Sequence, residues 1–253
     1  MVGPQRNTQS ASGRLVVIDA SVRTARSAHT LGCHTVFVQR PGAPVHDLVD
    51  DFSGYYSVDF TGETFKEFVL EVLRPLAPTA VVSLSEDGAL PAALANSLLG
   101  TPGTTADVLR RLTADAVGGE ADDTGDRHAY TFSEAGAHRW VALVDDGIQP
   151  TLPEHVVPER RLTVGDHDAV EAALTGFLDA AGLQNGPARI RLRSRDGEVR
   201  VLGATPTPGT DTEAELVGRL TGFDLVRASL GRALTLAGDD ATSPARAQEG
   251  VTR

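Results

Sequence analysis

Three arginines alternate with apolar residues near the middle of the C-terminal half. Arg189, Arg191 and Arg193 are separated by Ile190 and Leu192, and a period of two places alternate side chains on one face of a strand. A guanidinium can bind a carboxylate or phosphate through two parallel hydrogen bonds. Two interpretations stay open: this face binds a small anion, or it is the solvated face of an exposed hairpin.

A second group of polar residues follows an apolar run at residues 80–82. It consists of Ser83, Ser85, Glu86 and Asp87. The carboxylates could accept a proton from a substrate, and the hydroxyls could fix its position. Glu86 and Asp87 could instead simply begin the helix expected at residues 90–99, because carboxylates stabilise the positive end of a helix dipole.

The elements that must position these residues alternate along the chain. Apolar runs predict strands at 15–18, 35–38, 55–58 and 80–82, and helical spacing predicts helices at 21–31, 61–73, with Thr61 as cap, and 90–99. This order predicts a parallel sheet covered on both faces. Ligands of such sheets bind at the carboxyl ends of the strands, which here are residues 19–21, 39–40 and 83–87.

The C-terminal half reads as strands and helices around a hairpin. Two strands are predicted on either side of Asp196-Gly197, a turn signal. A three-residue turn at 195–197 places Arg191 and Gly203 on one face, and a two-residue turn separates them; both stay open. Thr210 and Glu213 have the spacing of a capping box, which predicts a helix start. An amphipathic helix is predicted at 167–181.

Composition limits the class of protein. The chain has 253 residues, a net charge of −11 and one cysteine, so we expect no nucleic-acid partner, no anionic-membrane binding and no internal disulfide. No apolar run reaches the roughly 20 residues of a membrane span, and the polar N-terminus lacks the core of a signal peptide. We therefore expect a cytoplasmic protein. No Cys or His stands at metal spacing around His128 and His138, so no metal site is expected.

Two stretches resemble ATP-grasp carboxylate–amine ligases. Residues 99–104, LGTPGT, and residues 186–220, GPARIRLRSRDGEVRVLGATPTPGTDTEAELVGRL, match phrases of that family in their frame. The resemblance implies an α/β fold, with a Rossmann-like pre-ATP-grasp domain at 13–103 and a truncated ATP-grasp core at 104–237. Residues 1–12 and 238–253 are predicted to be disordered tails.

The residues that do chemistry in the family are replaced. Asp115 stands where the family has a lysine, and residues 116–127 are too short for its small nucleotide-clamping domain. By the resemblance, Arg191 and Gly203 stand at the two carboxylates that hold Mg²⁺, which prefers oxygen ligands. Thr205 stands at the following asparagine, and Thr207 at an arginine. The resemblance thus implies a truncated, degenerate member without ATP, Mg²⁺ or another cofactor.

Three functions are compatible with these observations. The first is an ATP-independent enzyme of bacterial specialised metabolism that acts on a small carboxylate or amino-acid-like metabolite. The second is a non-catalytic partner, regulatory or metabolite-binding protein, and the third an unusual ATP-dependent ligase. We expect a homodimer. For the first function the candidate catalytic residues are Glu86, Asp87 and Arg191. The candidate substrate-binding residues are Ser83, Ser85, Arg139, Arg189, Arg193, Thr205 and Thr207.

Overall fold

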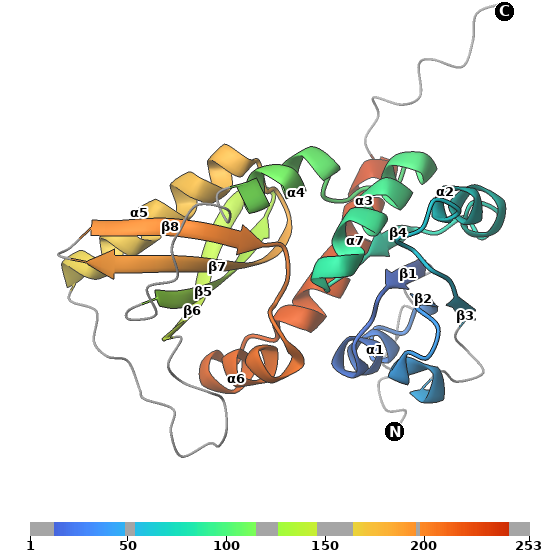
Figure 1. The fold of residues 1–253 in the computed structure, drawn as a ribbon, viewed down its shortest axis with the longest axis horizontal. Coiled ribbons are helices and arrows are strands. Elements are labelled where there is room, and N and C mark those ends of the chain that lie inside the picture. Colours follow the sequence, from blue (N-terminus) through green and yellow to red (C-terminus); the bar gives the residue numbers. More distant parts are fainter. Residues whose placement is uncertain (1–12, 49–53, 115–125, 146–163, 196–197, 243–253) are drawn as a thin grey trace, which may run out of the picture.

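The computed structural model describes residues 13–48, 54–114, 126–145, 164–195 and 198–242. They form a parallel and an antiparallel sheet, each of four strands and each accompanied by helices (Figure 1). The predicted α/β class is therefore confirmed. The predicted N-terminal tail, Asp115 and most of the loop predicted at 116–127 lie outside the described residues.

The N-terminal half contains the parallel sheet. Its strands are β1 (Arg14–Ile18), β2 (His34–Gln39), β3 (Gly54–Ser57) and β4 (Ala80–Val82), in the order β3-β2-β1-β4. The intervening elements are α1 (Val22–His29), η1 (Pro44–Leu48), α2 (Phe65–Phe68), η2 (Val69–Leu73) and α3 (Glu86–Leu99). Each of the four predicted strands is present.

Both faces of the parallel sheet are buried. Leu15 and Val17 point into one apolar cluster with α1, and Val16 and Ile18 point into another with α2, η2 and α3. All four side chains are completely shielded from solvent. A continuous apolar strand covered on both sides is the arrangement that the run at 15–18 predicts.

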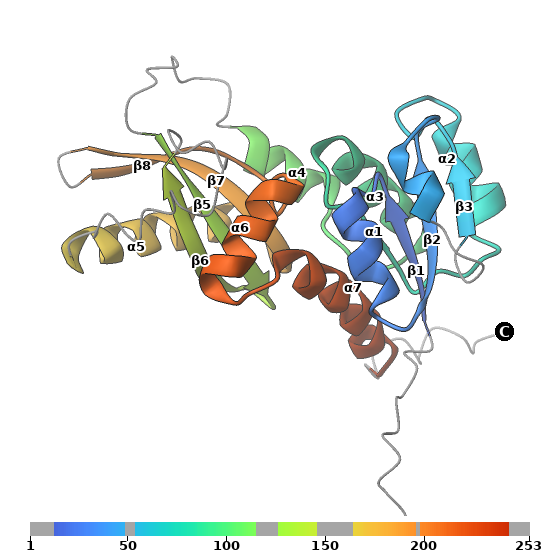
Figure 2. The same cartoon turned by 90° about the horizontal axis from the view of Figure 1, so that it is seen from below.

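The C-terminal half contains the antiparallel sheet, in the order β6-β5-β7-β8. Its elements are α4 (Ala106–Thr113), β5 (Asp126–Glu134), β6 (Ala137–Asp145), α5 (Val164–Ala181), β7 (Gly186–Arg195), β8 (Glu198–Thr205) and α6 (Asp211–Thr221). One face packs on α4 and α5. The other carries α6 at one end, as Figure 2 shows.

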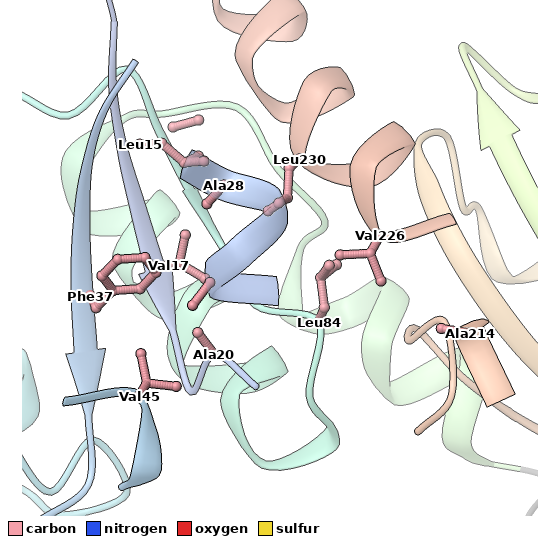
Figure 3. Packing of buried hydrophobic residues seen from close by; sticks show 12 residues of the cluster. Leu15, Val17, Ala20, Ala28, Phe37, Val45, Leu84, Ala214, Val226 and Leu230 are labelled. Carbon is pink, nitrogen blue, oxygen red and sulfur yellow. The ribbon is translucent and has the colours of Figure 1, made fainter. Parts of the chain in front are cut away.

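The last helix, α7 (Leu225–Thr242), returns to the N-terminal half. Its Val226 and Leu230 are buried in the same cluster as Leu15 and Val17, together with Ala214 of α6 (Figure 3). The parallel sheet is thus completed by a helix from the end of the chain. This helix continues past residue 238, where the sequence predicts a disordered tail to begin.

Two helix starts differ from the sequence-based expectation. Thr61 does not cap α2, because its hydroxyl donates to Asp59 (2.7 Å) in a turn and the helix begins only at Phe65. Helix α3 begins earlier than residue 90, because the Ser85 hydroxyl accepts the Gly88 N–H (3.0 Å) and so caps it. Glu86 and Asp87 consequently form its first turn.

The hairpin of β7 and β8 has the shorter of the two predicted turns but the pairing expected of the longer one. Arg195 pairs with Glu198, so only two residues separate the paired positions. The register then shifts between the Arg191 and Leu192 pairs, and Arg191 pairs directly with Gly203. The extra residue in β8, Leu202, forms a β-bulge. Arg191 and Gly203 therefore share a face, although a two-residue turn without the bulge would separate them.

None of the described helices is both long enough and apolar enough to span a membrane.

Candidate functional site

Four arginines lie on the face of the antiparallel sheet that points away from α5. Ala188, Ile190 and Leu192 are buried against α5, so the alternating residues of β7 point to the other side. Arg193 pairs in register with Arg200 of β8, and Arg191 with His128 of β5. We call Arg189, Arg191, Arg193 and Arg200 the arginine face.

Arg189 is the member of this face that is committed to the fold. Its guanidinium lies 3.1 Å from the Glu213 carboxylate of α6 and 3.4 Å from Nδ1 of His128. Glu213 also accepts a hydrogen bond from the Tyr130 hydroxyl (2.9 Å). Thr210 and Glu213 form the predicted capping box of α6. This network connects β5 and β7 to the first turn of α6.

The network shifts the proton affinity of two of its members. Burial raises the pKa of the Tyr130 hydroxyl, and the adjacent Glu213 charge raises it further. Burial alone would raise the pKa of Glu213. Hydrogen bonds from Thr210 and Tyr130 and the charge of Arg189 outweigh that effect and lower it. Glu213 is therefore an ionised partner of Arg189, and Tyr130 remains a neutral donor.

Arg191 is in a different situation from Arg189. It is half-buried in the middle of β7, yet it makes no hydrogen bond or ion pair with any residue in the described part of the chain. Its register neighbours across the hairpin and on β5 are Gly203 and His128, and neither brings a carboxylate. A half-buried cation without a counter-charge is favourable for binding an anion.

A second polar group lies at the carboxyl ends of the parallel strands. The Ser85 hydroxyl donates to the Asp19 carboxylate (2.6 Å) and lies 3.2 Å from the Ser83 hydroxyl. The Arg40 guanidinium lies 2.5 Å from Asp87 and 3.9 Å from Asp19. We call these residues, Asp19, Arg40, Ser83, Ser85 and Asp87, the strand-end group.

Asp19 and Arg40 are members that the sequence-based site assignment missed. The available signal was their position, since each directly follows the end of a strand, β1 and β2 respectively. Asp19 has a left-handed backbone conformation (φ 54°), which is uncommon outside glycine and tends to occur at functional sites. Arg40 additionally stacks on the Phe60 ring, 4.9 Å from its centroid.

The predicted catalytic carboxylates differ in their surroundings. Asp87 is exposed and ion-paired with Arg40. That pair raises the pKa of the Arg40 guanidinium, chiefly through the hydrogen bond to Asp87. Glu86 is exposed in the first turn of α3 and makes no hydrogen bond or ion pair within the described residues. The structure thus brings Asp87, Ser83 and Ser85 together and leaves Glu86 beside them.

The two polar groups are joined by a contact between helix starts. Asp211, the first residue of α6, accepts from the Ser21 hydroxyl (2.5 Å) and from the Arg23 N–H (3.2 Å) at the start of α1. Ser21 follows Asp19 by two residues, and Glu213 follows Asp211 by two. This contact therefore lies two residues from Asp19 of the strand-end group and two residues from Glu213, the partner of Arg189. Glu86 and Arg191 themselves are not in contact.

Three other predicted binding residues are placed less uniformly. Thr205 pairs in register with Arg189 and lies on the arginine face. Thr207 is almost fully buried (2% exposed), and its hydroxyl lies 3.2 Å from that of Thr205. Arg139 lies apart, on the edge strand β6, where it stacks over the Phe223 ring and lines a separate cavity of about 450 Å³. The described lining of that cavity includes no β7 arginine.

One arrangement has the composition of a catalytic triad but not its accessibility. The Ser133 hydroxyl lies 2.7 Å from Nδ1 of His138, and Nε2 of His138 lies 3.2 Å from the Asp179 carboxylate. Ser133 is completely buried, so a substrate cannot reach its hydroxyl. These bonds instead fasten the β5–β6 hairpin to α5. Among the described residues no group of three or more His, Cys, Asp or Glu could hold a metal ion.

Comparisons with known proteins agree in fold and differ in sequence. An L-amino acid ligase from Bacillus licheniformis superposes with a TM-score of 0.69 at 15% identity, covering 88% of this chain and 74% of that one. A phosphoribosylglycinamide synthetase from Anaerococcus prevotii gives 0.69 at 14% identity, over 88% and 75%. A biotin carboxylase from Campylobacter jejuni, in complex with β,γ-ATP, gives 0.63 at 10% identity, over 90% and 72%.

No protein-family model and no curated protein sequence matches the chain. The similarity to solved structures extends over both halves, and it places the chain among proteins of the ATP-grasp fold. At these identities the similarity establishes the fold alone.

Proposed function

We propose that this chain is an ATP-independent enzyme with an ATP-grasp-like fold. It binds a small carboxylate or amino-acid-like metabolite directly on arginine side chains and acts in bacterial specialised metabolism. The substrate lies between the arginine face and the strand-end group, whose elements are linked by the contact of Asp211 with Ser21. No metal or nucleotide takes part in this binding.

The observation that carries the proposal is the state of Arg191. It is half-buried on a sheet face with three further arginines and has no counter-charge within the described residues. The adjacent Arg189 shows what this face does when a carboxylate is available, because it pairs with Glu213 at 3.1 Å. A ligand carboxylate would pair with the Arg191 guanidinium in the same way, by accepting two parallel hydrogen bonds.

Loss of nucleotide binding is the second part of the proposal. The chain resembles the ligases in the frame of its hairpin, and the position at which the resemblance implies a magnesium-binding carboxylate holds Arg191, opposite Gly203. A guanidinium and a glycine reverse the local charge, so they disfavour a divalent cation. The single lysine, Lys66, is exposed in α2 and belongs to the N-terminal half.

The strand-end group supplies the chemistry for a reaction. Asp19 and Asp87 are carboxylates within 4 Å of Arg40, at 3.9 and 2.5 Å, and Ser85 fixes Asp19 through its hydroxyl. Glu86 is exposed next to them and is the carboxylate without a described partner. We assign it the role of general base toward a substrate held on Arg191.

One observation favours a non-catalytic metabolite-binding protein as the alternative. Asp87, the other predicted base, is held in an ion pair with Arg40 at 2.5 Å, so the paired oxygen already has a contact within the protein. In the alternative, the strand-end group only positions the ligand. A Glu86→Gln variant distinguishes the two functions. It should keep its ligand affinity in both cases, but turnover of the ligand by the wild type, lost in the variant, is expected only of an enzyme.

Calorimetry tests the binding site. Arg191→Ala should weaken binding of a small carboxylate such as succinate or L-glutamate by about 1.5–3 kcal/mol, which is the strength of a charged hydrogen bond. Arg110→Ala, an exposed arginine of α4, is the control and should bind as the wild type does. Unchanged affinity in both Arg191→Ala and Arg193→Ala would show that the arginine face is merely solvated.

Calorimetry also tests the predicted loss of nucleotide binding. ATP with Mg²⁺ should bind no better than in the millimolar range, because the arginine face lacks the carboxylates that a divalent ion requires. A magnesium-dependent affinity in the low micromolar range would instead support an ATP-dependent ligase.

We also propose a cytoplasmic homodimer, since two-fold pairs are the commonest closed assemblies. Light scattering that reports a monomer at working concentration would contradict it.

A further inference from the structure

A cavity lies between the two halves of the molecule and is separate from the arginine face. Its volume is about 390 Å³. Its walls come from β4, α3 and α7, from the start of α4, from the start of β7 and from the residue that follows β8. Small-molecule sites typically have volumes of about 300–1,000 Å³ and mostly apolar walls. Its described lining includes Ser83 of the strand-end group and no residue of the arginine face.

Most of the wall is apolar. Ala92 and Ala93 of α3, Leu109 of α4 and Leu183 before β7 are buried residues that line it. The polar side chains on this wall are largely satisfied internally: Asn96 donates to the Val81 carbonyl (3.0 Å) and accepts from Thr101 (2.7 Å). Such a wall favours an apolar body for the ligand.

One end of the cavity is polar. The Asn185 carbonyl oxygen, Oδ1, accepts two hydrogen bonds, from the Ala135 N–H (3.0 Å) and from Nε of Arg232 (2.9 Å). The orientation of the amide is therefore fixed, and Nδ2 is the atom left to donate to a ligand. It has no hydrogen-bond partner in the described part of the chain. Arg232, whose side chain is only 14% exposed, lies beside it and is also paired with the exposed Glu134 carboxylate at 3.4 Å.

From this geometry we propose that the interdomain cavity is a second ligand site. It binds a small apolar molecule, aromatic or branched aliphatic, that carries one carboxylate. The apolar body lies against the alanines of α3, and the carboxylate accepts from Nδ2 of Asn185 beside Arg232. Because the walls belong to both halves, the bound ligand contacts both and stabilises their arrangement.

Phenylacetate is a suitable probe for this site. Acetate has its carboxylate without the ring, and benzyl alcohol has its ring without the carboxylate. By calorimetry, phenylacetate should bind saturably to the full chain, and each of the other two should bind at least about tenfold more weakly, since each loses one of the two kinds of contact. The midpoint of thermal unfolding should rise with phenylacetate concentration.

Two variants disrupt the site, one by filling its apolar part and one by removing its hydrogen-bond donor. Ala89→Leu fills it from α3, at a half-buried position that lines the cavity. Asn185→Asp keeps the oxygen that Ala135 and Arg232 need and replaces the donor with a charged acceptor. Each should lower phenylacetate affinity by about tenfold or more. Ala180→Leu, at an exposed position of α5, is the matched control and should bind as the wild type does.

Arg191→Ala separates this proposal from the function proposed above. Phenylacetate affinity should be unchanged in Arg191→Ala, whereas succinate affinity should fall. If Arg191→Ala abolishes saturable binding of phenylacetate instead, the probe occupies the arginine face alone and the second site does not exist. The proposal is equally wrong if phenylacetate shows no saturable binding, or if Ala89→Leu and Asn185→Asp both bind it as the wild type does.

Discussion

The strand-end group and the arginine face both contain arginines, but they differ in whether carboxylates accompany them. At the strand ends, Arg40 is shared between Asp87 and Asp19, and Asp19 is further held by Ser85. On the arginine face, Arg189 is paired with the carboxylate of Glu213. Arg191, two residues along the same strand, has none in the described part of the chain.

The difference separates residues that hold the fold from residues available to a ligand. A half-buried charge that is paired contributes to the structure, and its loss leaves the partner uncompensated. A half-buried charge that is not paired makes no such contribution and carries the cost of partial desolvation. Stability measurements on the two classes of residue can therefore test the assignment without knowledge of the ligand.

The largest loss of stability is expected from Glu213→Ala. The change removes the partner of Arg189, the acceptor of the Tyr130 hydroxyl and one half of the α6 capping box. Together these should lower the free energy of unfolding by about 2–4 kcal/mol. Glu215→Ala on the same helix removes an exposed pair with Arg219 and should change it by less than about 1 kcal/mol. Urea unfolding of both variants measures the difference, and equal losses would contradict it.

The importance of Glu213 was only half predictable from the sequence. The spacing of Thr210 and Glu213 predicts the capping box, because that contact is local and depends on four consecutive residues. The contacts of Glu213 with Arg189 and Tyr130 span the chain between β5 and α6. Contacts of that kind follow from the folded arrangement of the sheet, and no local pattern specifies them.

A smaller loss is expected from Gly88→Ala, which tests how tightly the strand-end group is packed. An added Cβ at Gly88 would lie 2.3 Å from the Ser83 hydroxyl and 3.0 Å from Cβ of Asp19. Crowding of this kind costs about 1–3 kcal/mol, and it outweighs the helix propensity of about 1 kcal/mol gained on replacing glycine. Thermal unfolding should show a lower midpoint.

Gly176→Ala provides the control for that prediction. Gly176 lies in α5, and an added Cβ there meets nothing within 4 Å. The same substitution should therefore stabilise the protein, by up to about 1 kcal/mol. If Gly88→Ala also stabilises it, the strand-end group is looser than its distances indicate.

The register of the hairpin is a case in which the sequence offered two answers. The alternation of arginine and apolar residues correctly predicts which residues of β7 are buried, because burial follows a period of two. The turn length could not determine the pairing, because a bulge at Leu202 shifts it by one residue. Bulges depend on the fit between neighbouring strands, and this one places Arg191 opposite Gly203.

A change of pH should weaken the Arg189 contact selectively. The pKa of Glu213 is lowered from its ordinary value of 4.5, so its folded pKa lies below its unfolded pKa. The stabilisation is therefore fully present above the unfolded pKa, and it is lost as the pH falls through the folded pKa. The stability difference between wild type and Glu213→Gln should accordingly shrink as the pH is lowered from about 5 through the folded pKa of Glu213. A difference that stays constant over this range would show that Glu213 does not act as an ionised partner.

The smallest effect, and the one that tests the comparison most directly, is expected from Arg191→Leu. Arg191 has no counter-charge to lose among the described residues, and the alternate positions on either side of it in β7 are arginines too, Arg189 and Arg193. Removing one of several like charges relieves repulsion, so the free energy of unfolding should be unchanged or higher, within about 0.5 kcal/mol of wild type. Arg189→Leu, two residues away, should lower it because Glu213 loses its ion-pair partner. A residue whose removal costs ligand affinity but no stability is one that the fold retains for function. If Arg191→Leu destabilises the protein as much as Arg189→Leu does, Arg191 has a structural partner and is not an anion site.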